Sequence, residues 1–269
     1  MEKKRILFIS QEITPYLPKS EMSMVGRYLP QGMQEKKREI RTFMPRYGLI
    51  NERRNQLHEV IRLSGMNLII DGTDHPLIIK VASIQAARMQ VYFFDNEDFF
   101  KRKAMFTDKK GKLFEDNDER SIFFSRGALE TVRKLRWSPD IVHCNGWMAA
   151  IAATYVKKAL KNDPLFQKTK VIYSVYNDDF EGILNTDFAK KSKFGGMTKR
   201  NTDLIEKTPN YINLNKLGIK FSDGIIYGSE KINPELDEFI KKGRKKVLPY
   251  QNPENYINAY SDFYDKILS

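Results

Sequence analysis

Polar side chains follow the first expected strand, at a place where a phosphate or sugar site could form. Residues 4–10, K-R-I-L-F-I-S, predict a buried strand, and residues 11–24 lead from it to a helix without one glycine. Lys19 and Ser20 are the candidate binding residues there, with Lys19 acting as a mobile point charge. Backbone amides cradle a phosphate only where they approach it closely, and side chains such as Ser20 and Glu21 obstruct that approach. This loop therefore occupies the place of an anion site but lacks its glycines.

A second group of candidates follows two later strands. The pattern H-C-N-G-W begins within the expected strand at residues 141–144, and V-Y-N begins at the last residue of the expected strand at residues 171–175. The candidates are, in chain order, His143, Asn145, Trp147, Asn177 and Gly182. Asn145 can hydrogen-bond a sugar hydroxyl, but it cannot change charge near neutral pH as an imidazole does. A lone histidine such as His143 at a strand end is more often a packed, hydrogen-bonded residue than a catalytic one.

Acidic and aromatic residues near these strands have both a structural and a functional interpretation. The acids of residues 115–119 precede an expected helix, whose dipole favours them, so we predict that Asp116 or Asn117 caps it. The acids of residues 178–181 could supply a general base, but a solvated loop is the favoured interpretation. Some aromatic side chains look exposed and could stack on sugar rings. They are Tyr16, Tyr47, Trp147 and Tyr176.

Composition argues against several classes of protein. Lys and Arg total 46 against 34 Asp and Glu, a net charge of +12, but these residues lie in short clusters beside expected helix ends. Such clusters favour solvated helix ends over a nucleic-acid surface. No apolar run approaches the ~18 residues of a membrane span, and no signal peptide is apparent. The lone Cys144 permits no internal disulfide, and 3 histidines without ligand spacing predict neither metal nor cofactor. We expect a cytoplasmic protein.

Short β-rich runs alternate with helical patterns and predict the fold class. The runs expected in the main sheet are 5–9, 40–44, 141–144, 171–175, 224–227 and 246–248. Runs separated by helices indicate an α/β fold with a Rossmann-like, mainly parallel sheet and helices on both faces. Further runs alternate like hairpins, with turns at Ser64-Gly65 and Asp71-Gly72. They are 60–63, 67–70, 77–83 and 89–94, and they predict an antiparallel hairpin insertion.

Apolar spacing predicts the longer helices. Residues 117–136 and 148–160 each present one buried face, and the second is rich in alanine where it would pack closely. The apolar residues of 256–268 recur at helical spacing, so this last helix should dock on the domain. Residues 186–210 are polar and contain Gly195-Gly196. They predict a mobile surface excursion.

Stretches spread over most of the chain carry a resemblance to a known family. They are E-I-T-P at 12–15, Y-L-P at 28–30, M-P-R-Y-G at 44–48, Y-F-F-D-N-E-D-F-F at 92–100, E-D-N-D-E-R-S-I-F-F-S-R-G-A-L-E at 115–130, S-P-D-I-V-H at 138–143 and N-K-L-G-I-K-F-S-D at 215–223. In this order they resemble the N-terminal half of the bacterial glycogen and plant starch synthases, the fifth family of glycosyltransferases.

The resemblance implies one half of a GT-B arrangement, in which two Rossmann-like domains face each other and ADP-glucose lies in the cleft. Enzymes of this family transfer glucose to the non-reducing end of an α-1,4-glucan with retention of configuration and no essential metal. Their C-terminal domain makes most of the nucleotide contacts. We expect residues 1–269 to be a single N-terminal-type domain without that second domain. The implied ligands are ADP-glucose and α-glucan.

The family's first motif is altered in this chain. The motif reads K-x-G-G-L-x-D-V, and its lysine and glycine amides meet the donor phosphate. Alignment through residues 28–30 without a gap places Pro18 at the lysine and Ser20 and Glu21 at the glycines. Lys19 lies one residue away and could substitute as a charge. Glu21 opposes this, because a carboxylate repels a diphosphate.

The other two motifs are altered at their polar positions as well. The family's H-x-H-D-W is H-C-N-G-W here, with Asn145 in place of the second histidine and Gly146 in place of the aspartate. The family's I-H-N is V-Y-N, with Tyr176 in place of histidine, while Gly182 is retained. The resemblance therefore implies a conserved scaffold whose chemistry is weakened.

These observations support three hypotheses about function. The first is a retaining glucosyltransferase of glycogen or starch synthase type, inactive as this chain alone and completed by a separate chain that carries the nucleotide domain. The second, which we favour for the chain alone, is a non-catalytic homologue. It would bind glucan, a partner synthase or another copy of itself through the open cleft face, where an apolar patch is expected. The weakest is a polyanion-binding protein driven by charge.

Overall fold

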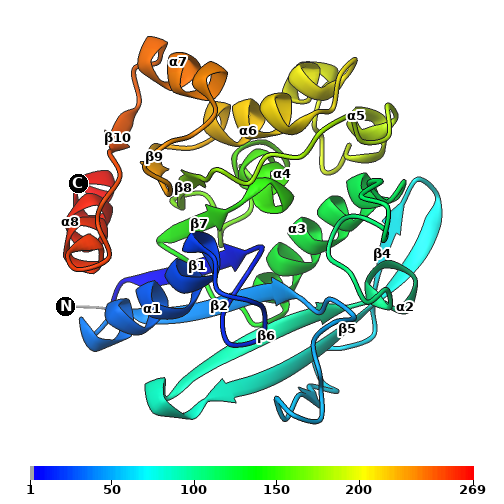
Figure 1. Cartoon of the computed structure of the whole chain (residues 1–269), viewed down its shortest axis with the longest axis horizontal. Helices are drawn as coiled ribbons and strands as arrows, with labels where there is room; N and C mark the ends of the chain where they lie inside the picture. Colours follow the sequence, from blue (N-terminus) through cyan, green and yellow to red (C-terminus); the bar gives the residue numbers. More distant parts are fainter. Residues whose placement is uncertain (1–2) are drawn as a thin grey trace.

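A computed structural model describes residues 3–269 (Figure 1). Its strands are β1 (Arg5–Ser10), β2 (Glu39–Pro45), β3 (His58–Glu59), β4 (Met66–Ile70), β5 (Thr73–Ile84), β6 (Met89–Asp95), β7 (Ile141–Asn145), β8 (Lys170–Val175), β9 (Gly224–Tyr227) and β10 (Lys246–Leu248). Its α-helices are α1 (Glu21–Glu35), α2 (Glu97–Phe100), α3 (Asn117–Lys134), α4 (Ala150–Thr154), α5 (Phe188–Lys191), α6 (Tyr211–Lys220), α7 (Pro234–Lys242) and α8 (Tyr256–Leu268). The strands predicted for the main sheet all form.

The strand order is β10-β9-β8-β7-β1-β2-β6-β5-β3, and β4 pairs with β5 outside this row. All neighbours from β10 to β6 run parallel, whereas β5 pairs antiparallel with β6, β4 and β3. The sheet is therefore mixed and mainly parallel, with an antiparallel hairpin insertion at one side. This is the predicted fold class, a Rossmann-like half of a GT-B arrangement.

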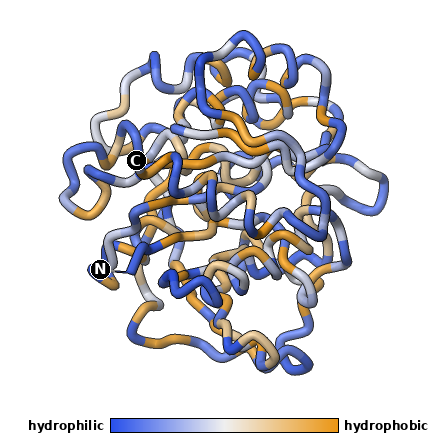
Figure 2. Tube along the Cα trace, turned by 90° about the vertical axis from the view of Figure 1, so that its left-hand side faces the viewer, coloured by the Kyte–Doolittle hydropathy of each residue, from blue (hydrophilic) through white to orange (hydrophobic). Residues whose placement is uncertain are grey.

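Alternate residues of the strands explain why helices cover both faces. Ile6 and Phe8 of β1 lie in one apolar cluster with side chains of α1 and α8. Leu7 and Ile9 lie in a larger cluster with side chains of α3, α4 and α6. Because successive side chains of a strand point to opposite faces, each face is buried by its own helices. Figure 2 shows the apolar segments concentrated in the interior of the domain.

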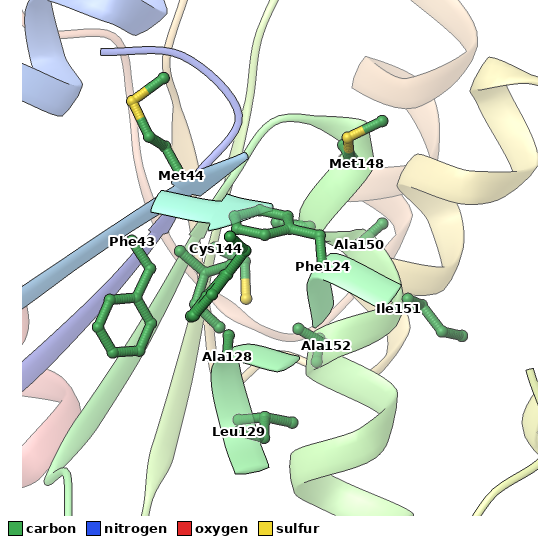
Figure 3. Close-up of a cluster of buried hydrophobic side chains, with 14 of the residues drawn as sticks. Phe43, Met44, Phe124, Ala128, Leu129, Cys144, Met148, Ala150, Ile151 and Ala152 are labelled. Carbon is green, nitrogen blue, oxygen red and sulfur yellow. The ribbon is translucent and has the colours of Figure 1, made fainter. Parts of the chain in front are cut away.

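The larger cluster depends on close packing between α3, α4 and the sheet. Figure 3 shows Phe124, Ala128 and Leu129 of α3 beside Cys144 of β7 and the alanines of α4. Ala150 and Ala152 are fully buried, so their small side chains let α4 approach its neighbours closely, as the composition of this segment predicts. The helical segment changes pitch along its length, from a 3₁₀ turn at Trp147–Ala149 to a π-helical turn at Tyr155–Ala159.

The hairpin insertion differs from the prediction in two strands. Residues 60–63 form turns instead of a strand, and the short β3 lies just before them. Strand β6 does form a hairpin with β5, but its other edge pairs in parallel with β2. The insertion is thus continuous with the main sheet. Alternation of apolar residues predicted three of the four runs as strands, was wrong for residues 60–63, and contained no information on which neighbour each strand would pair with.

The predicted cap of α3 and the predicted surface excursion at residues 186–210 are both corrected. Asp116 is the N-cap residue of α3 by position, but its side chain makes no capping hydrogen bond and pairs instead with Arg102. Residues 186–210 are packed rather than a loose excursion, because Phe188 and Ile205 are fully buried. In this segment the Lys191 ammonium lies 3.0 Å from the buried Asp118 carboxylate of α3. Local polarity predicted exposure, but this ion pair holds the segment against the domain.

Within residues 3–269, none of the helices combines the length and apolar character needed to cross a membrane. The last helix, α8, docks on the sheet beside α1, as its apolar spacing predicts.

Candidate functional site

The carboxyl ends of β1 and β7 form the natural place for a ligand. These strands are neighbours, with Ser10 opposite Asn145. From β1 the chain proceeds to β2 on one side, and from β7 it proceeds to β8 on the other. In open α/β sheets, ligands bind outside the carboxyl ends of the strands at such a switch of direction. The three sequence motifs all lie near this edge, because the first follows β1, the second covers the end of β7, and the third begins at the last residue of β8.

The start of α1 is closed by the chain's own side chains. Ser20 and Ser23 form a capping box, in which the Ser23 N–H donates to Ser20 Oγ at 3.0 Å and the Ser20 N–H donates to Ser23 Oγ at 2.8 Å. The Ser20 hydroxyl donates to the Glu12 carboxylate at 2.7 Å. Helix-start amides bind anions only when they are free. The capping box thus occupies donors that a phosphate would need.

A carboxylate lies in the first turn of α1. Glu21 accepts a hydrogen bond from the Ser229 hydroxyl, in the loop after β9. The Asn177 N–H donates to the same hydroxyl oxygen at 3.1 Å. Glu21 therefore ties α1 to the carboxyl ends of β8 and β9. Lys19 is exposed, and within residues 3–269 its ammonium has neither an ion pair nor a hydrogen bond.

His143 lies inside the domain. Its side chain is fully buried, with Nδ1 at 2.7 Å from the Tyr264 hydroxyl and Nε2 at 2.7 Å from the Ser174 hydroxyl. Burial lowers the pKa of His143 to about 3, so its ring is neutral at physiological pH. Both ring nitrogens have protein partners. This geometry favours the structural interpretation of His143.

Both polar atoms of the Asn145 side-chain amide lie close to other side chains. Its Oδ1 accepts from the Tyr176 hydroxyl at 3.2 Å, and its Nδ2 lies 3.4 Å from Ser10 Oγ. The side chain is 1% exposed. The amide is thus already part of an internal network, and a substrate hydroxyl would have to displace one of these partners.

Side chains from two other segments fill the place that a side chain of residue 146 would take. The φ of Gly146 is +86°, and a Cβ atom placed on it would lie 2.7 Å from Gln11 Oε1 and 2.9 Å from the Met22 thioether. Gln11 also accepts a hydrogen bond from the Met148 N–H at 3.1 Å. An aspartate at this position would therefore strain the backbone and require the ends of the Gln11 and Met22 side chains to move.

Sequence reasoning named Asp178 among the possible general bases but favoured a solvated loop, and the structure corrects that choice. Asp178 is partly buried, and its carboxylate lies 2.8 Å from the Tyr211 hydroxyl and 3.3 Å from Gln11 Nε2. Burial raises the pKa of Asp178 to about 7, and the nearby charge of Glu12 acts in the same direction. The signal in the sequence was the position of Asp178, three residues beyond the end of β8, a strand that is buried from Val171 to Val175. The neighbouring Asp179 is exposed, as predicted.

The aromatic residues expected to be exposed are all buried. Tyr16, Tyr47, Trp147 and Tyr176 expose 7%, 0%, 1% and 2% of their surfaces. The Trp147 ring packs 4.8 Å from Phe106 and 4.9 Å from Phe180, measured between centroids. These rings are core residues, and none of them offers a free face to a sugar.

Asn177 and Gly182 lie on the exposed loop after β8. Gly182 has a φ of +89°, which a glycine adopts without strain. The loop borders a hollow of about 610 Å³ against residues 111–115. Within residues 3–269, no group of three His, Cys, Asp or Glu side chains is placed to hold a metal ion.

Comparisons with known proteins show which family the chain belongs to. The sequence profile of the starch synthase catalytic domain matches residues 5–248. The glycogen synthase of Chlorobaculum tepidum is 32% identical over 247 residues, which cover 91% of this chain and 50% of that protein. The glycogen synthase of Chlorobaculum parvum is 33% identical over 220 residues, covering 81% and 44%. The chain thus spans about half the length of the curated relatives it matches.

A solved structure shows the same fold. The catalytic domain of Arabidopsis thaliana starch synthase IV, bound to ADP and acarbose, superimposes with a TM-score of 0.71. The superposition covers 93% of this chain and 52% of that chain, with 18% sequence identity.

Proposed function

Because the chain belongs to the starch synthase catalytic domain family, we propose that it acts in glucan metabolism as a homologue that does not bind or turn over ADP-glucose on its own. One observation carries this proposal. The helix start that would receive a donor diphosphate is closed by the Ser20–Ser23 capping box and carries the Glu21 carboxylate.

Electrostatics supports this proposal. A diphosphate seated against the first turn of α1 would meet Glu21, and two like charges 4 Å apart repel by about 4 kcal/mol at an effective dielectric near 20. Lys19 is exposed and flexible, so its attraction is weakened by water and by salt. The balance of these two charges opposes donor binding.

The polar residues at β7 and β8 support the same proposal. Asn145 and Tyr176 hydrogen-bond each other, and His143 uses both ring nitrogens inside the domain. None of these groups is poised to gain or lose a proton near neutral pH. Stabilisation of charge during glucosyl transfer would therefore need groups that these positions do not supply.

Calorimetry and a transfer assay test the proposal together. We expect no heat of binding when ADP-glucose is titrated into the protein, and no transfer of radiolabelled glucose to glycogen. The double variant Ser20→Gly, Glu21→Gly removes both obstacles and should gain measurable affinity for ADP. Saturable binding of ADP-glucose by the wild-type protein, or glucose transfer, would overturn the proposal.

A second candidate function is docking of a partner through the carboxyl edge of the sheet. Leu49 and Ile183 belong to loops at this edge and expose 39% and 51% of their surfaces. Exposed apolar side chains beside a ligand edge are typical of interaction surfaces. The partner would be a synthase chain that supplies a nucleotide domain, or a second copy of this chain. Light scattering of the protein alone and with a purified synthase distinguishes the two.

We also propose that residues 3–269 fold as one domain of N-terminal type. Helix α8 supports this proposal, because its buried side chains share one apolar cluster with β1, β7, β8 and β9. A helix that completes the core of the sheet is part of the domain.

A further inference from the structure

Another hollow lies at the amino ends of the parallel strands, at the opposite end of the sheet from the candidate site. It is bounded by the end of α1, the start of β2 and the turn that joins β5 to β6. Its volume is about 440 Å³, within the range of about 300–1,000 Å³ typical of small-molecule sites. Apart from Ile40, its lining side chains are two arginines, three glutamines, a serine and a tyrosine, and none of the described residues that line it is acidic.

The turn between β5 and β6 places Arg88 at this hollow. A 3₁₀ turn at Gln85–Ala87 ends at Arg88, whose φ of +49° leads the chain back into β6. The Gln34 side chain of α1 donates from Nε2 to the Arg88 carbonyl oxygen at 3.4 Å, so the turn is attached to α1, beside which it lies in Figure 1. The Arg88 backbone is thus held in place, while its exposed guanidinium is free to reach a ligand.

Arg41 is the more rigid of the two arginines. It is half-buried, and its guanidinium carbon lies 5.2 Å from the centroid of the Trp137 ring. Nη1 lies 3.4 Å from the Tyr92 hydroxyl, whereas within residues 3–269 the buried Nε has no hydrogen-bond partner. A guanidinium held on an aromatic face loses little freedom on binding and presents its donors in a fixed fork. Arg41 therefore offers a preformed donor group to an anion.

The protein does not neutralise the positive charge of this hollow. Within residues 3–269, neither Arg41 nor Arg88 forms an ion pair. The nearby Glu39 carboxylate is held by other donors, Arg5 Nε at 3.2 Å and Trp137 Nε1 at 2.6 Å. Two cations that share a hollow repel each other, and an anion bound between them removes that repulsion.

We propose that this hollow binds the phosphate group of a small phosphate ester between Arg41 and Arg88. Guanidinium forks bind phosphate oxygens in pairs, and a dianion matches two positive charges better than a monocarboxylate does. The side-chain amides of Gln85 and Gln90 can donate to the same group. A phosphate group fills only part of the hollow, which leaves room for an organic substituent. Lys19 and the start of α1 do not line the hollow, so the proposal is independent of the proposed function.

Binding of phenyl phosphate at pH 8 and constant ionic strength tests this proposal, with line broadening in ³¹P NMR as the measurement. We expect saturable binding by the wild-type protein. Inorganic phosphate should compete but bind more weakly, because it leaves part of the hollow empty. Benzoate carries one charge and should displace phenyl phosphate only at concentrations at least about tenfold higher.

Four variants locate the site. Arg88→Asn removes one guanidinium with a residue that tolerates positive φ, and should weaken phenyl phosphate binding at least about fivefold. Arg136→Asn is the matched control with unchanged affinity, because Arg136 is exposed, has a φ of +50° and does not line the hollow. Arg41→Lys keeps the charge but loses the fork, and should weaken binding at least about threefold. Lys19→Ala should leave the affinity unchanged.

Absence of saturable phosphate binding would overturn this proposal and leave the proposed function, which concerns ADP-glucose, intact. Equal weakening in Arg88→Asn and Arg136→Asn would also overturn it, because net charge alone would then account for the attraction. Tighter binding of inorganic phosphate than of phenyl phosphate would overturn the choice of an ester. Weakening by Lys19→Ala with Arg88→Asn unchanged would place the anion at the start of α1, and would contradict both this proposal and the proposed function.

Discussion

Single residues at the carboxyl edge decide whether this scaffold can hold charge. Gln11 contacts Asn145, Met148 and Asp178 through its backbone and side chain, and so joins β1 to β7 and to the loop after β8. Each contact satisfies a polar group that would otherwise be free for a ligand. A buried polar network with all its members paired is rigid, and a ligand would have to break it to enter. The polar groups of this edge are thus paired with one another and are not free to bind a ligand.

Asp178 should make the stability of the protein depend on pH. The Tyr211 hydroxyl has one hydrogen but lies 2.6 Å from the Tyr176 carbonyl oxygen and 2.8 Å from Asp178 Oδ1. A protonated Asp178 supplies the missing hydrogen. Because its folded pKa of about 7 exceeds the unfolded value near 4, this contribution is complete below pH 4 and is lost as the pH rises through 7.

The variant Asp178→Asn tests this assignment, because its amide mimics the protonated carboxyl. Relative to wild type it should gain about 1–3 kcal/mol of unfolding free energy between pH 4.5 and pH 8. Urea unfolding at both pH values measures this gain. Asp179→Asn, which changes the exposed neighbour, is the matched control and should shift stability equally at both. A pH-independent difference for Asp178→Asn would show that the carboxyl is ionised throughout.

The junction between β7 and the helical segment after it shows how elements constrain the site. Gly146 has a φ of +86°, and a Cβ atom at this position would lie within 3 Å of Gln11 and Met22. Gly146→Asp should therefore cost roughly 2–4 kcal/mol, from backbone strain and from overpacking together. Gly111→Asp is the matched control, because Gly111 has a φ of +81° but no atom within 4 Å of the position that a Cβ would take. The control should show strain alone, about 1–2 kcal/mol.

Chemical denaturation of the two aspartate variants measures this difference. If Gly146→Asp costs no more than Gly111→Asp, then Met22 and Gln11 move aside easily and the site is less tightly filled than the contacts indicate. If the difference is found, the junction has repacked around glycine, and restoring the aspartate alone cannot restore the family's site.

The spacing of apolar residues predicted most strands and helices, because each kind of element has its own characteristic spacing. Buried strands such as β7 and β8 appear as short runs of mostly apolar residues, and α8 appears as a helical repeat. The motifs were correctly assigned to the carboxyl ends of these strands. Burial of Trp147 was not predictable, because the rings that cover it, Phe106 and Phe180, come from distant loops. The hollow lined by Tyr28 of α1 and by Tyr250 was missed for the same reason, since its two walls are far apart in sequence.

At the scale of the whole molecule, one mainly parallel sheet is covered on both faces, and the last helix completes one of them. Phe263 of α8 is 4% exposed and lies against Gly224 of β9. Trp137 and Trp147 belong to the apolar cluster on the opposite face. Tryptophan fluorescence therefore reports on a part of the domain that α8 does not touch directly, which makes the coupling of the two faces measurable.

Phe263→Ala should lower the stability of the entire domain. Removing a buried phenylalanine typically costs about 3–5 kcal/mol, and in a single cooperative unit the whole transition moves by that amount. We expect the urea midpoints from tryptophan fluorescence and from circular dichroism at 222 nm to fall together. Asp262→Ala, an exposed neighbour on the same helix, should leave both midpoints nearly unchanged. A fluorescence midpoint that stays in place while the helical signal is lost earlier would show that α8 melts independently, and would contradict the proposal of one domain.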